Sequence, residues 1–106
     1  MRETPNLSYI KELSDGDTVF EQKFIGILKK EFPEEVRTYV NYIENDQPRS
    51  AAEIVHKLKH KFNILSLSNS YAFAVAYEEK LRAGDTQSDR SFRMLLDMIQ
   101  NFLNTL

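Results

Sequence analysis

Four polar residues on one predicted helix face carry the chemistry that this sequence offers. Residues at offsets i, i+3, i+4 and i+7 of a helix share a face, and within residues 50–67 these are His56, Lys59, His60 and Asn63. A neutral imidazole keeps a lone pair on one ring nitrogen, so an exposed His56 can act as a nucleophile. A phosphoryl group accepted there would carry about two negative charges. Lys59, one turn along, could stabilise them, and a protonated His60 could add a further donor.

The other side of residues 50–67 is apolar, which favours a helix with one buried face. Ser50 is predicted to be its N-cap, and Glu53 three residues later would complete a capping box. The residues predicted to be buried are Ile54, Val55, Leu58, Phe62 and Leu65. His56 lies across the helix from Leu58 and is therefore expected to stand in water.

Phosphoryl transfer requires a protein mainly to position the reacting groups and to stabilise charge. The sequence has no Gly-rich nucleotide-binding loop and no set of carboxylates spaced for Mg²⁺, so the donor and acceptor proteins would have to supply both. The pattern predicts a phosphoryl carrier that needs no cofactor of its own, not an independent enzyme.

The segment before this one is predicted to be one long helix over about residues 18–45. Asp17 stands where an N-cap should, because its carboxylate can accept the free amides of the next turn. Pro33 removes one backbone hydrogen bond and crowds the carbonyl four residues back, so we expect a bend there. The residues predicted to be buried are Phe20, Phe24, Ile27, Leu28 and Phe32 before the proline and Val36, Tyr39, Val40 and Ile43 after it.

Three further helices are predicted from the same periodicity. A short one over residues 7–13 ends at Asp15-Gly16, where glycine can take the left-handed conformation. Another follows residue 70 and ends at Gly84-Asp85, and the last opens at Ser88 or Asp89. The residues predicted to be buried in the last two helices are Tyr71, Ala72, Val75, Ala76 and Leu81, and Phe92, Leu95, Leu96, Ile99, Phe102, Leu103 and Leu106.

Four long amphipathic helices with short connections can bury their apolar faces only against one another. The sequence therefore predicts an all-α fold, an antiparallel up-down four-helix bundle with a short N-terminal capping helix, in one domain over residues 1–106. The chain has no cysteine, a formal charge of −2 without a basic stripe, and no apolar run near the ~20 residues that cross a bilayer. We expect a cytoplasmic monomer that binds neither nucleic acid nor membranes.

The run His56-Lys57-Leu58-Lys59 resembles the H-x-L-K-G signature of histidine-containing phosphotransfer (HPt) domains, which lies on the second long helix of a four-helix bundle. The similarity extends over nearly the whole chain and includes Gly16-Asp17, Glu78-Glu79 and the turn at residues 82–85. It implies that His56 accepts the phosphoryl group, that Lys59 accompanies it, and that the partners are response-regulator receiver domains, a hybrid histidine kinase, or both. His60 and Ser66 stand where the family has glycine.

A partner must also find apolar contact around the histidine. Ala52, Ile64 and Leu67 fall within about 80° of His56 on the helix, and with Asn63 they are the residues predicted to bind a partner. An alternative stays open, in which Ile64 and Leu67 pack under the start of the next helix.

Two other functions follow from the same residues. Glu53-x-x-His56 has the spacing of di-iron bundles, and His56-x-x-x-His60 can chelate on one turn, but a di-iron centre needs a second Glu-x-x-His motif, so we expect no metal. The second alternative is an adaptor bundle that binds receiver or kinase domains without accepting phosphate.

Overall fold

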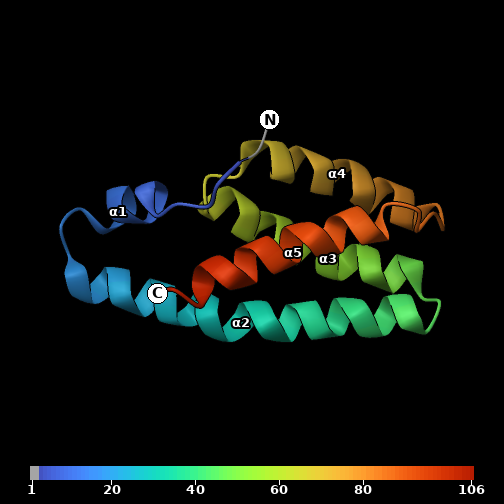
Figure 1. Ribbon diagram of the computed structural model, residues 1–106, viewed down its shortest axis with the longest axis horizontal. Helices are drawn as coiled ribbons and strands as arrows, with labels where there is room; N and C mark the ends of the chain where they lie inside the picture. Colours follow the sequence, from blue (N-terminus) through green and yellow to red (C-terminus); the bar gives the residue numbers. More distant parts are fainter. Residues whose placement is uncertain (1–2) are drawn as a thin grey trace.

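The computed structural model describes residues 3–106, and it is all-helical, without a strand in that range. Residues 1–2 of the predicted domain lie outside the described residues. Figure 1 shows the four longer helices lying lengthwise beside one another, with the short one next to the beginning of the longest. The helices are α1 (Ser8–Ser14), α2 (Thr18–Glu44), α3 (Pro48–Ile64), α4 (Ser68–Arg82) and α5 (Asp89–Leu103).

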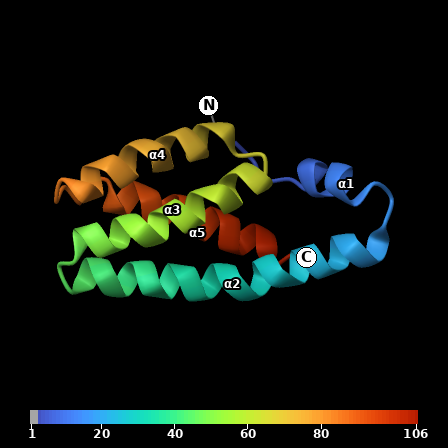
Figure 2. The same cartoon turned by 180° about the vertical axis from the view of Figure 1, so that it is seen from behind.

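α3 has two of the long helices as its main neighbours. It packs along both α2 and α4, and both views show it between these two helices (Figures 1 and 2). α5 packs on α2, and the ring of its Phe92 reaches Phe62 of α3 and Tyr77 of α4 at centroid distances of 5.7 and 5.1 Å. These contacts give all four long helices one common core.

α2 begins at its predicted N-cap and forms one long helix, as predicted, while the bend expected at Pro33 stays a prediction. The Oδ1 atom of Asp17 accepts a hydrogen bond from the amide of Phe20 at 3.0 Å, and the helix runs through Pro33 to Glu44 without a break. The prediction of its buried residues was wrong for Phe20 and Ile27, which are 44% and 55% exposed. The early part of α2 has α1 beside it, and this part buries Leu28, as predicted, together with Ile25, which was not predicted to be buried.

The predicted ends of α3 were displaced by a few residues. The helix starts at Pro48 with Gln47 as N-cap, so Ser50 is not its N-cap and the capping box with Glu53 does not form. Proline suits the first helical position because its missing N–H would have no partner there. At the other end, Ile64 is the last helical residue and Ser66 has a φ of +66°. Helical angles therefore no longer apply beyond residue 64.

The buried side of α4 also differs from the prediction. Ala72, Val75 and Ala76 are exposed, whereas Ala74 and Tyr77 are buried. Alanines lie on both the buried and the exposed side of this helix, so its apolar periodicity is weak and the larger side chains decide which side is buried. For α5 the prediction is confirmed for Phe92, Leu96, Ile99 and Leu103, which are all buried. Three other residues predicted to be buried pack against the core but are only partly buried, namely Leu95, Phe102 and Leu106.

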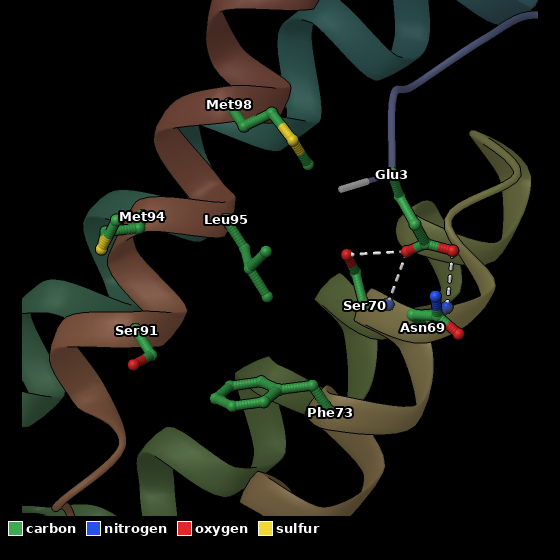
Figure 3. Close-up of a pocket in the computed structure, with 8 residues that line it drawn as sticks. All are labelled: Glu3, Asn69, Ser70, Phe73, Ser91, Met94, Leu95 and Met98. Atoms are coloured by element: carbon green, nitrogen blue, oxygen red, sulfur yellow. Dashed lines mark hydrogen bonds between the residues drawn. The ribbon is translucent and has the colours of Figure 1, made fainter. Parts of the chain in front are cut away.

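The first turn of α4 is capped from a distant part of the chain. Leu67, its N-cap, makes no side-chain hydrogen bond, and the carboxylate of Glu3 instead accepts hydrogen bonds from the amides of Asn69 and Ser70, both at 2.7 Å. Burial raises the pKa of Glu3, but these bonds outweigh it and lower the pKa. Figure 3 shows Glu3 at one side of a pocket of about 530 Å³, whose other lining residues are Asn69, Ser70, Phe73, Ser91, Met94, Leu95 and Met98.

Candidate functional site

His56 lies in the middle of α3 with 53% of its side chain exposed. Its Nδ1 atom lies 3.3 Å from both carboxylate oxygens of Glu78, a residue of α4 that is 22 positions later in the chain. A carboxylate can only accept, so the neutral ring that makes this contact carries its proton on Nδ1. The lone pair then belongs to Nε2, and the geometry selects that nitrogen as the nucleophile.

Glu78 is the centre of a small ionic cluster. It is 5% exposed, and besides His56 it contacts Nζ of Lys59 at 2.9 Å and Nη2 of Arg82 at 2.7 Å. Burial raises the pKa of Glu78, but the hydrogen bonds from Lys59 and Arg82 and the positive charges nearby outweigh burial and lower the pKa. The carboxylate is therefore charged at neutral pH.

Lys59 was expected to be exposed beside His56, where it could meet an incoming phosphoryl group, but its ammonium points to Glu78 instead. Its side chain is only 12% exposed, and its ammonium donates to Glu78. In this structure Lys59 therefore stabilises the carboxylate that orients His56. An ammonium has three donors, so this contact leaves others that a small movement could turn toward the ring.

His60 and Asn63 are exposed on the same side of α3 as His56. The rings of His56 and His60 meet edge to face, with centroids 5.1 Å apart. The prediction of a shared exposed face is confirmed for these three residues, but not for Lys59, the fourth residue of the predicted face, which is largely buried.

Two of the residues predicted to bind a partner are buried. Ala52 and Leu67 have no exposed surface, so neither can contact a docked protein, and Ile64 is partly buried against the core. Ala52 lies only about 40° from His56, but on the side of α3 where Lys59 reaches across to α4. Leu67 lies beyond the end of α3, where a helical angle no longer describes its direction.

Sequence reasoning did not assign a role to Glu78 or Arg82. Both lie in segments that carry the resemblance, and their i, i+4 spacing is typical of an ion pair on a helix. Val75 was also misplaced, because it was predicted to be buried and is 39% exposed one turn before Glu78. Only the packing of α4 on α3 brings these residues to the histidine.

Two negative findings apply to residues 3–106. None of the helices there combines the length and the apolar character that a bilayer crossing requires. Over the same residues, no group of three or more His, Cys, Asp and Glu side chains is placed so that it could hold a metal ion.

No protein-family model, no curated protein and no solved structure matches the chain.

Proposed function

We propose that this chain is a histidine phosphotransfer protein of the HPt type, which accepts a phosphoryl group on Nε2 of His56 and passes it to a receiver domain of a two-component phosphorelay. One observation carries the proposal: a half-exposed imidazole at mid-helix whose Nδ1 is held by a buried, charged carboxylate. This arrangement presents one ring nitrogen to a partner and balances the charge that the ring acquires.

The proposed step needs no proton to move within this chain. The lone pair of Nε2 attacks the phosphorus of an aspartyl phosphate on the donor, a P–N bond forms, and the P–O bond to the aspartyl carboxylate breaks. The ring becomes positively charged while Nδ1 keeps its proton. Glu78 stabilises that charge at 3.3 Å, in the way that an aspartate stabilises the imidazolium of a catalytic triad.

The reverse reaction passes the phosphoryl group to the next receiver. The donor and acceptor proteins supply Mg²⁺ and the loops around their aspartates, so this chain contributes the nucleophile and its orientation. That division of labour makes it a carrier in a relay between two catalysts.

The fold that we infer for this function is an antiparallel up-down four-helix bundle of α2–α5, capped at one end by α1. The side-by-side packing of α2 with α3 and of α3 with α4 supports it, as do the short connections at residues 45–47 and 65–67. Such a bundle holds the middle of α3 rigidly between two neighbours, which suits a nucleophile that must meet several partners in one geometry.

The docking surface follows from exposure around the histidine. His60 and Asn63 of α3 and Val75 of α4 are exposed close to His56 and Glu78. They give a small mixed polar and apolar surface, which is typical of a transient interface. Ala52 and Leu67 have no part in it, because they are buried.

Chemical labelling tests the proposal without a known partner. Phosphoramidate, a small phosphoryl donor, should place one acid-labile phosphoryl group on the folded chain, and His56→Gln should remove the label. His60→Gln is the matched control on the neighbouring turn and should keep the label. Labelling that persists in His56→Gln would contradict the assignment, whereas a chain that binds receiver domains but never takes a label would be an adaptor.

A further inference from the structure

His56 and His60 have a geometry that phosphoryl transfer does not require. They lie on successive turns of one face of α3, both exposed, with ring centroids 5.1 Å apart at an interplanar angle of 87°. Two imidazoles that bind one tetrahedral Zn²⁺ through bonds of about 2.0–2.1 Å place their ring centroids about 5 Å apart. The observed centroid separation therefore matches that of a two-imidazole chelate, which forms once each ring turns a nitrogen toward the same ion.

We propose that His56 and His60 form a two-histidine chelate for a divalent transition ion such as Zn²⁺, and that the ion controls access to Nε2 of His56. Imidazole is a ligand that Zn²⁺, Cu²⁺ and Ni²⁺ accept readily. With two ligands from the protein, the remaining positions belong to water. The pair differs from a di-iron centre, which needs Glu-x-x-His motifs on separate helices.

Glu78 supports the chelate as well as the nucleophile. Histidines that bind metal ions almost always donate their other ring N–H to a carboxylate, a carbonyl or water, which fixes the tautomer and raises ligand basicity. His56 already makes this contact through Nδ1, at 3.3 Å from the buried carboxylate. The same nitrogen, Nε2, is thus prepared both for a metal ion and for phosphorus.

The metal ion and the phosphoryl group compete for His56, because Nε2 has a single lone pair. A metal ion bound there occupies the electrons that must attack phosphorus, so a chain with bound metal cannot accept the phosphoryl group. This consequence rests on the proposed function, whereas the chelate itself does not. His60, which stands where the related signature has glycine, then acts as the second ligand that makes the inhibition tight.

The chelate is tested by adding Zn²⁺ to the full chain and following the imidazole nitrogens by NMR and the heat of binding by calorimetry. Wild type should bind one ion. The NMR signals of the ligating nitrogens of His56 and His60 should shift together during the titration. Loss of a supporting partner alone costs a metal site about 10–100-fold in affinity, so His60→Ala should weaken binding at least about tenfold. Alanine is the best helix former and the position is exposed, so this variant should fold.

A double variant, His60→Ala with Asn63→His, is the matched control. It keeps two exposed imidazoles on the same face but separates them by seven positions, roughly 10 Å along the helix, which is too far for one ion. It should bind Zn²⁺ as weakly as His60→Ala. Unchanged affinity in either variant would overturn the chelate, because the ion would then bind His56 alone or another site.

Competition is measured with the phosphoramidate reaction, in which the donor P–N bond breaks, ammonia leaves and the new P–N bond forms on His56. Zn²⁺ at a concentration that saturates wild type should suppress wild-type labelling by tenfold or more relative to the metal-free protein. It should change the labelling of His60→Ala little relative to metal-free His60→Ala. Full labelling of wild type with bound Zn²⁺ would overturn the proposal that the ion blocks Nε2 of His56. If wild type takes no label without metal, the proposed function fails, and the titration still decides the chelate.

Discussion

Glu78 is the residue on which the chemistry of His56 depends most directly. It is buried and contacts one imidazole and two cations from the two helices α3 and α4. A buried carboxylate with such partners strongly favours its charged form, and removing it leaves Lys59 and His56 without their acceptor. One substitution therefore tests both the stability of the α3–α4 contact and the orientation of the nucleophile.

Glu78→Gln should lower the free energy of unfolding by about 1–3 kcal/mol at pH 7. The folded pKa of Glu78 lies below its usual value of 4.5, so its charge stabilises the protein above that pH, and the effect disappears as pH falls through the folded pKa. Urea unfolding of wild type and variant at pH 7 and at low pH measures this. The difference in stability should shrink at low pH, and a difference independent of pH would contradict the role of the charge.

Ser66 lies just beyond the end of α3, where the backbone leaves the helical conformation. It takes a φ of +66° directly after the C-cap of α3, a conformation that costs a residue with a side chain about 1–2 kcal/mol. The turn at residues 65–67 then directs the chain into α4. Its geometry explains why Leu67 is buried although helical angles placed it beside His56.

Ser66→Gly should raise the free energy of unfolding by up to about 1 kcal/mol, because glycine adopts this conformation without strain and part of the gain is offset by its greater freedom in the unfolded chain. Ser68→Gly is the matched control, since Ser68 is helical and glycine lowers stability there. Thermal unfolding of both variants measures the contrast. Equal effects of the two substitutions would show that Ser66 is not strained.

At the scale of the whole molecule, a hydrogen-bonded network fastens three helices around the core. The hydroxyl of Tyr39 on α2 lies 2.6 Å from that of Tyr77 on α4 and donates to Asp89 at the start of α5 at 2.5 Å. Nε of Arg93 donates to both oxygens of Asp89 at 3.0 Å. Because both tyrosine hydroxyls have partners, the network adds specificity without leaving buried polar groups unpaired.

This network should limit stability at alkaline pH. Burial raises the pKa of Tyr77 to about 12 and that of Tyr39 further, so both favour the neutral form in the folded chain. Their contribution to stability is complete below pH 10, the usual tyrosine pKa, and declines above it. The part from Tyr77 is lost as pH rises through about 12, and the part from Tyr39 at higher pH. Urea unfolding should show a smaller alkaline loss in Tyr77→Phe than in wild type, while Tyr9→Phe, an exposed control, should leave the loss unchanged.

Local features of the sequence determined most of the secondary structure. Helical periodicity, the cap at Asp17 and the glycine turns each act over a few residues, so the five helices and the burial of Phe92 and Ile99 could be predicted. The exposure of His56 could be predicted in the same way, because the angle between His56 and Leu58 around the helix axis depends on that one helix alone.

The tertiary structure alone decided what surrounds that histidine. Glu78 reaches His56 because α4 packs on α3 in one particular rotation. The periodicity of α4 does not specify that rotation, because small apolar residues lie on both its buried and its exposed side. The same packing buries Ala52 and exposes Val75. Contacts between residues far apart in the chain depend on how helices approach, which is a property of the whole core rather than of any one segment.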